Sequence, residues 1–411
     1  MNVLKLAHAA AQTAFRAERR IDPIYRDLFD DTLRDPLFDL AQLIVNAGRP
    51  RRTGLAIAEE RTLPREKECA DKIVALMSAF MRDNYPPGEV QRAGNTKTYG
   101  VVRGEFKVLS GLPSELRHGV FARPKSYPAW VRFAGPGPLA PPDINDNGVL
   151  SFAIKLMGVP GPKLSPDEKQ TQDFLGISAP TFTTPDVVAN VDLQRQVGAG
   201  TPLFYFLDPR KSHLMDLIMQ GLYSRTQSNP LEASYFSCVP YLLGEGQAMQ
   251  YSLRPKSGRR TRAPLNPSDN YLREAMARTL TDRKVVFEFC VQLQRDPDRM
   301  PIENASVRWP EDLSPHVQVA ELALPVQQFD SQAQLDFAGN LSFNPWHAIP
   351  EHRPLGSQNR ARRVIYQRLS EARQQMNLER RIEPTGAETF GASPKKKKRQ
   401  KKRASAEQTV R

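Results

Sequence analysis

Three side chains near the carboxyl end of the chain are spaced so that they could bind a metal ion together with an anion. Arg362, Tyr366 and Arg373 lie in residues 357–380, which contain neither proline nor glycine and should form a helix. At about 100° per residue, these side chains fall within about 40° of one another. A guanidinium beside a phenol favours the phenolate, an anionic ligand suited to ferric iron. A solvated basic face is the plain alternative, because this segment carries six arginines.

The amino-terminal residues, up to about residue 85, have the pattern of helices. Asp22-Pro23 and Asp35-Pro36 each offer an N-cap followed by a proline at the first helical position, and Gly48 should end the second helix. A third helix is predicted over residues 64–84. Its apolar residues recur at helical spacing and should face the core.

From residue 97 to about 324 the pattern is one of strands. Segments 101–109, 129–133 and 149–157 are predicted strands, and residues 285–294 alternate apolar with polar side chains. Such alternation is typical of a strand with one buried face in an antiparallel sheet or barrel. A helical insertion is expected over 209–223. His347 and His352 lie in the loop before the last helix, where we expect surface or supporting roles rather than axial ligation.

Composition limits the class of protein. With 40% hydrophobic and 25% charged residues the chain can bury a large core, so disorder throughout is excluded. The net charge is +13, but eight positive charges lie in residues 395–403, and removing them leaves only +5. The three cysteines are far apart and suggest neither a disulfide framework nor a zinc site. We expect a soluble, cytoplasmic protein without a transmembrane segment.

Several segments resemble motifs of the catalase superfamily and occur in the same order. Arg362-x-x-x-Tyr366 followed by Arg373 resembles the haem-ligand segment of that family. Residues 342–366 are most similar to the small catalase-like haem proteins, and the likeness extends over about residues 90–375. The other similar segments are 92–97 (RAGNTK), 131–133 (VRF), 150–156 (LSFAIKL) and 172–180 (QDFLGISAP).

The resemblance implies an α+β fold, a catalase-like antiparallel β-barrel surrounded by α-helices. We expect a helical region over 1–88, the haem-binding domain over 89–383 and a disordered polybasic tail over 384–411. The implied cofactor is haem b, with Tyr366 as the ligand of iron and Arg362 supporting its phenolate. The propionates would meet Arg92, Arg132 and Arg373.

The other face of the haem departs from the family. Asn95 stands at the position of the distal histidine, Ser178 at that of the distal asparagine, and Ala134 follows Val131-Arg132-Phe133 where the family has serine. An amide does not titrate near neutral pH and cannot act as a general acid or base.

We therefore expect an enzyme that converts peroxides, with small lipid-like organic hydroperoxides as substrates, as in the allene-oxide-forming branch of the superfamily. Dismutation of hydrogen peroxide should be weak. The alternatives are a non-catalytic haem-binding sensor or carrier, and a scaffold that binds no haem. The basic tail could attract polyanions nonspecifically, and the sequence leaves homo-oligomerisation open.

Overall fold

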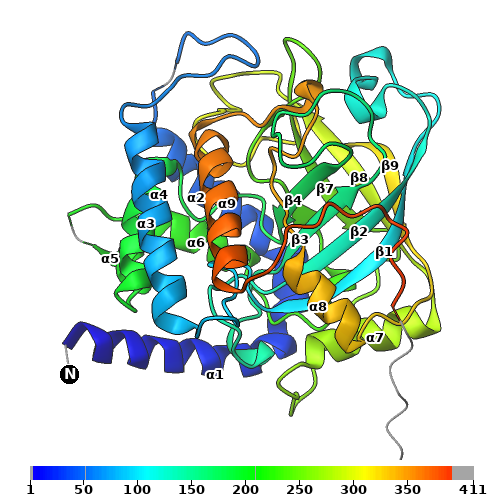
Figure 1. The fold of residues 1–411 in the computed structure, drawn as a ribbon. Coiled ribbons are helices and arrows are strands. Elements are labelled where there is room, and N and C mark those ends of the chain that lie inside the picture. Colours follow the sequence, from blue (N-terminus) through cyan, green and yellow to red (C-terminus); the bar gives the residue numbers. More distant parts are fainter. Residues whose placement is uncertain (1–2, 51, 209, 391–411) are drawn as a thin grey trace, which may run out of the picture.

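A closed antiparallel barrel forms the centre of the molecule. The computed structural model describes residues 3–50, 52–208 and 210–390. Within them the sheet order is β5-β4-β3-β2-β1-β9-β8-β7-β6, and β5 also pairs with β7, which closes eight strands into the barrel (Figure 1). The strands are β1 Thr98–Val108, β2 Ser126–Ala134, β3 Ser151–Leu156, β4 Gln172–Ile177, β5 Tyr235–Phe236, β6 Tyr241–Leu242, β7 Ala248–Pro255, β8 Val285–Leu293 and β9 Val317–Leu324.

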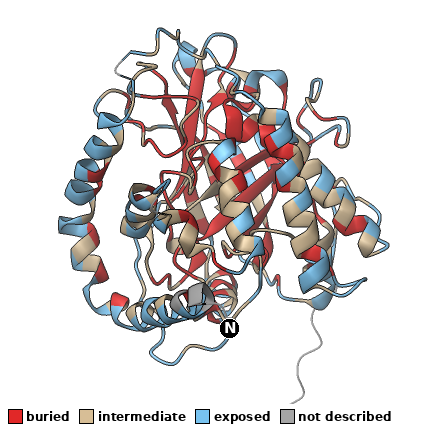
Figure 2. Ribbon diagram, turned by 90° about the vertical axis from the view of Figure 1, so that its left-hand side faces the viewer, coloured by how far each residue is buried: buried red, intermediate tan, exposed pale blue. Residues whose placement is uncertain are grey.

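Aromatic side chains fill the barrel. The rings of Phe174 and Phe289 are 5.0 Å apart, and Phe106 lies 5.1 Å from Phe289. All three side chains are buried. Figure 2 shows that most of the residues in the strands are buried as well. The barrel interior is therefore a packed core and not a channel, as in other small barrels.

The predicted alternation in β8 is confirmed only in its first half. Phe287 is buried between two half-buried neighbours, but every residue from Phe289 to Leu293 is buried. A loop covers the outer face of this second half, where the Gln292 side chain donates a hydrogen bond to the carbonyl of Ser314 (2.8 Å). The alternation of apolar and polar residues in a strand does not reveal whether another part of the chain covers its outer face.

Helices surround the barrel, with α3, α4 and α9 on one side and α7 and α8 beside β1 (Figure 1). The helices are α1 Val3–Thr32, α2 Arg34–Ala47, α3 Glu66–Asn84, α4 Val187–Gly198, α5 Leu203–Leu207, α6 Leu214–Tyr223, α7 Tyr271–Asp282, α8 Gln332–Asn340 and α9 Ser357–Met376. The insertion predicted over 209–223 corresponds to α6, whereas α4 and α5 were not predicted. No described helix is long and apolar enough to cross a membrane.

The start predicted for the first helix is wrong. Pro23 lies inside α1, and Asp22 is buried and accepts a hydrogen bond from the backbone N–H of Thr226 (2.6 Å) instead of capping a helix. The end of α2 at Gly48 is confirmed. The third predicted helix corresponds to α3, although only part of its apolar stripe is fully buried.

The carboxyl-terminal segment contacts the barrel before it leaves the described residues. Trp130 on β2 donates a hydrogen bond to Glu388 Oε2 (2.8 Å), Arg103 donates to the carbonyl of Gly386 (2.8 Å), and the Phe390 ring lies 5.9 Å from Trp130. Residues 385–390 therefore pack against the protein, unlike the disordered tail predicted from residue 384. The polybasic run 395–403 lies outside the described residues.

Candidate functional site

Helix α9 presents the arginine and tyrosine predicted as an iron-binding pair. Arg362 Nη2 donates a hydrogen bond to Tyr366 Oη (3.0 Å), and Arg362 Nη1 donates to Asn359 Oδ1 (3.0 Å). Burial lowers the pKa of Arg362, but the facing phenols of Tyr366 and Tyr241 outweigh it, and the net shift is upward. Arg362 is therefore a permanent cation held against the Tyr366 oxygen.

Two residues, Gly356 and Arg360, fix the start of α9. Gly356, with φ 86°, precedes the helix, and a Cβ added there would lie 2.5 Å from the carbonyl oxygen of Ile302. In the first turn, Arg360 pairs with Glu60 (2.5 Å), Glu66 (2.6 Å) and Glu303 (2.9 Å). The position of Tyr366 thus depends on charges that lie far away in the sequence.

The apolar face of α9 packs against α3 and α4. Ala361 and Ile365 contact a cluster that includes Ile73 on α3 and Val191 on α4. Tyr366 and Met77 lie at the edge of this cluster and also line a cavity between the helices and the barrel. This packing turns the phenol toward the cavity.

The cavity, called here the central cavity, contains about 1180 Å³ of space between atoms, part of it open to solvent. Seven residues were predicted to bind haem or to lie on its distal side, and six of them line this cavity. They are Arg92, Asn95, Arg132, Arg362, Tyr366 and Arg373. The fold thus brings together residues from the loop before β1, from β2 and from α9.

Three of these residues form a group of cations, of which Arg132 and Arg373 are buried and Arg92 is half-buried. Arg92 Nη2 donates to the carbonyls of Ala338 (2.9 Å) and Leu341 (2.5 Å), and Arg373 donates to the carbonyl of Gly339. Arg132 Nη2 donates to the carbonyl of Asn95 (2.5 Å). Arg132 is 5% exposed and Arg373 is 4% exposed. Backbone carbonyls orient these guanidiniums but do not neutralise them.

Acidic side chains do not balance this charge. Among the described residues neither Arg92 nor Arg132 forms an ion pair, and the Arg373–Glu379 contact is long, at 3.9 Å. Burial and then the neighbouring Arg373 lower the pKa of Arg132 to about 9, and burial, followed by the neighbouring Arg132 and Arg373, also lowers that of Arg92. Buried charges are normally paired, so this group requires an anion.

On the opposite wall of the cavity, only one of the two predicted distal residues is present. Asn95 lines the cavity in a left-handed backbone conformation (φ 48°). Ser178 is not among the lining residues, because its Oγ accepts a hydrogen bond from the backbone N–H of Leu150 (2.9 Å). Ile177, the last residue of β4, lines the cavity instead. A shift of one residue exchanges the two faces of a strand.

Comparison with known proteins identifies the fold. The sequence matches no family model, and no curated protein is similar to it. The structure resembles a bacterial catalase (TM-score 0.53, 17% identity, 85% of this chain and 72% of that chain covered). It also resembles a fungal catalase (0.54, 14%, 84% and 70%) and catalase A from Saccharomyces cerevisiae (0.54, 14%, 85% and 74%).

This chain has a catalase-like fold. At such low identity the likeness shows the fold alone. Within that fold, the residues that line the central cavity determine which chemistry is possible.

The two histidines of the loop before α9 are fully buried, so the surface position considered for them is wrong. His352 Nε2 accepts a hydrogen bond from the backbone N–H of Val120 (3.0 Å), and burial lowers its pKa to about 4. His352 is therefore a neutral structural residue. His347 is the only histidine that lines the central cavity.

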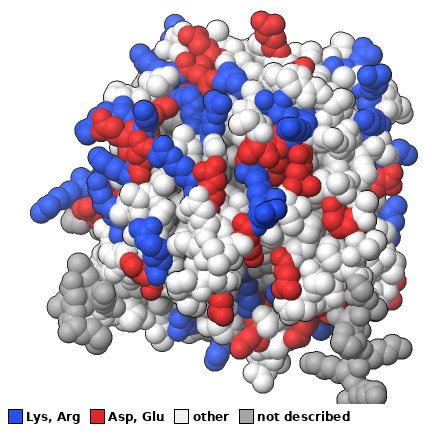
Figure 3. All heavy atoms as spheres, in the orientation of Figure 1, with Lys and Arg blue, Asp and Glu red and all other residues white. Residues whose placement is uncertain are grey.

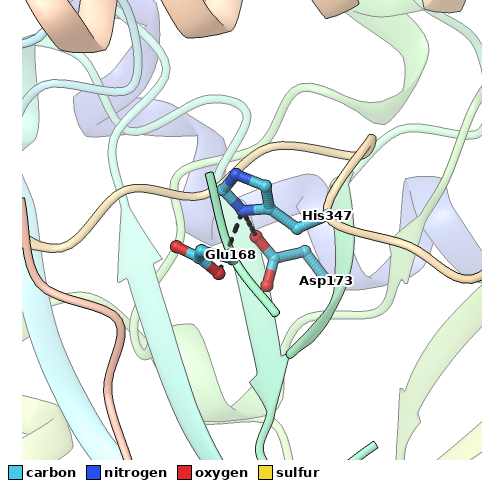
Figure 4. Close-up of side chains that lie close together, drawn as sticks. All are labelled: Glu168, Asp173 and His347. Carbon is cyan, nitrogen blue, oxygen red and sulfur yellow. Dashed lines mark hydrogen bonds and ion pairs between the residues drawn. The ribbon is translucent and has the colours of Figure 1, made fainter. Parts of the chain in front are cut away.

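His347 belongs to a buried group of charges that the sequence did not reveal (Figure 4). Its Nδ1 lies 2.9 Å from Asp173 and 3.2 Å from Glu168. These three side chains could surround a metal ion. Lys155 Nζ, however, lies 2.8 Å from Asp173, contacts Glu168, and is 3.2 Å from His347 Nδ1. The ammonium therefore supplies the positive charge that a metal would bring.

The residues of the central cavity fit haem on two grounds. The Tyr366 phenol with Arg362 behind it is a suitable ligand for ferric iron. The uncompensated guanidiniums of Arg92, Arg132 and Arg373 suit carboxylates, to which arginine forms strong charge-assisted hydrogen bonds. Cys238 and Ile177, which the sequence did not single out, also line this cavity.

Proposed function

We propose that the chain binds haem b in the central cavity and converts peroxides, organic hydroperoxides in preference to hydrogen peroxide. The observation that carries the proposal is a group of three arginines, two of them buried and none, among the described residues, with an acidic partner closer than 3.9 Å, in the same cavity as the Arg362–Tyr366 pair. A catalase-like fold with this cavity supports the same cofactor.

Each residue has a defined part in this proposal. Tyr366 would bind the iron as a phenolate, and Arg362 would stabilise that anion. Arg92, Arg132 and Arg373 would bind the two propionates. Bound ferric haem would supply the redox chemistry that breaks the oxygen–oxygen bond of a peroxide.

The preference for organic hydroperoxides rests on Asn95. Its amide can donate a hydrogen bond to a peroxide oxygen but cannot take up a proton and return it. Hydrogen peroxide cleavage depends on that proton transfer more than homolytic cleavage of an organic hydroperoxide does. The apolar neighbours Ile177 and Phe152 also suit an organic substituent.

The test is steady-state turnover by the haem-loaded protein with cumene hydroperoxide and with hydrogen peroxide. We expect kcat/KM to be higher for cumene hydroperoxide. Oxygen release from hydrogen peroxide at rates typical of catalases would contradict the role given to Asn95.

A non-catalytic haem sensor or carrier is the second candidate. The absence of a titratable side chain at Asn95 favours it. Full haem binding without turnover of either peroxide would establish this alternative.

A further inference from the structure

Exposed apolar side chains are concentrated on α1 and α2. Among the described residues, 11 of the 22 large hydrophobic side chains that are exposed lie within residues 6–44. The helix that begins at N in Figure 2 is mostly exposed, and in Figure 1 this helix, α1, crosses below α3 at the edge of the molecule. Soluble monomers rarely expose a large apolar patch without a partner. This surface is therefore a candidate interaction site.

The apolar side chains of α1 include one stripe that runs along the helix. Its members follow one another at alternating intervals of four and three residues, the spacing of the buried seam of a coiled coil. Ile24 and Leu28 are 77% and 72% exposed. Asp22 and Arg26, on the opposite face, are buried against the rest of the protein. The stripe therefore faces solvent, and it consists of Ala10, Ala14, Ala17, Ile21, Ile24 and Leu28, all of them exposed.

Pro23 does not interrupt this stripe. Proline lacks a backbone N–H, so it leaves the carbonyl of Arg19 without its helical partner. That carbonyl accepts a hydrogen bond from Thr226 Oγ1 (2.7 Å), on the side of α1 that faces the rest of the protein. The stripe thus continues on one helix from Ala10 to Leu28.

The width of the stripe and the charges beside it favour a helix of another protein molecule over a membrane. Two apolar positions in seven make the narrow seam that packs against a single helix. A helix that lies in a membrane surface has a broader apolar face and mostly basic flanks. The residues beside the stripe carry both signs, with Arg16 and Arg20 next to Glu18 and Asp27.

The order of side-chain sizes makes the stripe complementary to a second copy of itself. Its first half is alanine, and its second half is isoleucine and leucine. When two copies of α1 run antiparallel with a two-fold axis at Arg19, every layer pairs a small side chain with a large one, so the layers interdigitate. A parallel pair would instead place alanine against alanine at one end. The facing antiparallel pairs are Ala10 with Leu28, Ala14 with Ile24 and Ala17 with Ile21.

We propose that two copies of this chain associate through this stripe, as an antiparallel pair of α1 helices. Residues 10–28 span about 27 Å of helix, and contact over that length would bury roughly 600 Å² on each copy, which together exceeds the total of about 1,000 Å² that a specific interface needs. The two Arg20 side chains approach each other beside the axis, where solvent screens their repulsion. An interface of this size is small, so the dimer should dissociate in the micromolar range. The dimer does not depend on the proposed function.

Analytical ultracentrifugation of the full-length protein tests the interface. The wild type should sediment as a dimer in equilibrium with the monomer. Ile24→Glu should raise the dissociation constant about 10-fold or more, because it places a charge in a layer that is buried only in the dimer. Leu265→Glu is the matched control, since Leu265 is fully exposed outside α1 and should leave the constant unchanged. Circular dichroism verifies that both variants fold.

Three results would overturn the inference. The first is a wild type that stays monomeric at all concentrations, and the second is a monomeric wild type that binds phosphatidylglycerol vesicles. The third is an equal weakening of the dimer by Ile24→Glu and Leu265→Glu.

Pairs of new cysteines test the antiparallel register. The three native cysteines are buried, so thiols added to the stripe should be the reactive ones. A mixture of Ala17→Cys and Ile21→Cys proteins should form a disulfide-linked heterodimer on mild oxidation, because a disulfide needs Cα atoms within about 7 Å. A mixture of Ala10→Cys and Ile21→Cys proteins places the thiols about 10 Å out of register and should form none. Equal cross-linking in the two mixtures, or none in the first, would overturn the antiparallel pairing.

Discussion

At the scale of single residues, the side chains around the central cavity divide into those that could hold an anion and those that cannot transfer protons. Among the described residues, Arg92, Arg132 and Arg373 have no acidic partner closer than 3.9 Å, so their charge implies a bound anion. Asn95 faces the same cavity with an amide. We therefore assign cofactor binding a firmer physical basis than hydrogen peroxide chemistry.

Asn95→His should raise hydrogen peroxide turnover. A positioned general acid or base is typically worth about 10²- to 10⁴-fold, but the gain here should be smaller. Ile177 and Ala134 offer no hydrogen bond to orient the imidazole. Histidine tolerates the left-handed backbone of position 95 better than most residues do. Oxygen evolution by haem-loaded protein measures the effect, and an unchanged rate would count against Asn95 as the distal residue.

His347 should make stability depend on pH. Burial and Lys155 lower its pKa, but Asp173 and Asp167 outweigh them and the net shift is upward. The imidazolium therefore stabilises the fold fully below about pH 6.5, the pKa of an unperturbed histidine, and this contribution is lost as pH rises through the raised folded pKa. The free energy of unfolding of wild type and His347→Gln should therefore converge as pH rises above about 6.5 and through the raised folded pKa.

His316→Gln provides the opposite sign as a control. Burial lowers the pKa of His316 to about 3, so the folded protein keeps this imidazole neutral. Stability therefore falls as pH drops below about 6.5, where the unfolded chain takes up a proton. As pH rises, the free energy of unfolding of the wild type relative to the variant should decrease for His347→Gln and increase for His316→Gln. Parallel pH profiles would show that His347 is not charged in the folded protein.

At the scale of elements, α9 connects the site to the rest of the fold. Its helical pattern and its Arg362–Tyr366 spacing could be predicted, because both are local. The Arg360 contacts with Glu60, Glu66 and Glu303 could not, because the loops that bring these carboxylates together are set by tertiary packing. The same holds for Lys155, whose partners are 13 to 192 residues away.

Local patterns also misled at element ends. Asp22-Pro23 has the chemistry of a helix start, yet α1 continues through it because Asp22 is used in a tertiary contact with Thr226. The sequence predicts Ser178 at the site, whereas its neighbour Ile177 lines the cavity. Motif order is enough to predict the fold, but only the strand register decides which side chain reaches the site.

Arg360→Met should destabilise α9. Removing one cation from three partly buried carboxylates should cost about 2 kcal/mol or more of the free energy of unfolding and weaken haem binding. Arg368→Met is the control, because its ion pair with Asp71 (2.7 Å) is half exposed and should be worth less than about 1 kcal/mol. Denaturant unfolding and haem titration of both variants measure the difference. Equal losses would contradict the anchoring role of Arg360.

At the scale of the whole molecule, charges of both signs are mixed on the face that Figure 3 shows. There, Lys and Arg are interspersed with Asp and Glu. This agrees with a net charge of only +5 outside residues 395–403. We therefore expect an attraction to polyanions to come from that run of basic residues.

Two truncations should separate the basic run from the fold. Deleting residues 394–411 should leave the melting temperature and haem content unchanged and weaken salt-sensitive retention on DNA. Deleting residues 385–411 also removes the contacts of Glu388 and Phe390 with Trp130, and should cost about 2 kcal/mol or more. Loss of folding in the shorter deletion would contradict this division.

Haem titration of the wild type and Tyr366→Phe, followed by absorption spectroscopy, tests the central claim most directly. The wild type should bind one equivalent of haem, since the central cavity holds one phenol with one arginine behind it. Tyr366→Phe removes the phenol oxygen that the proposal assigns to iron, so haem should be lost or its ferric spectrum should change. A wild type that binds no haem, or an unaltered ferric spectrum in Tyr366→Phe, would contradict the account.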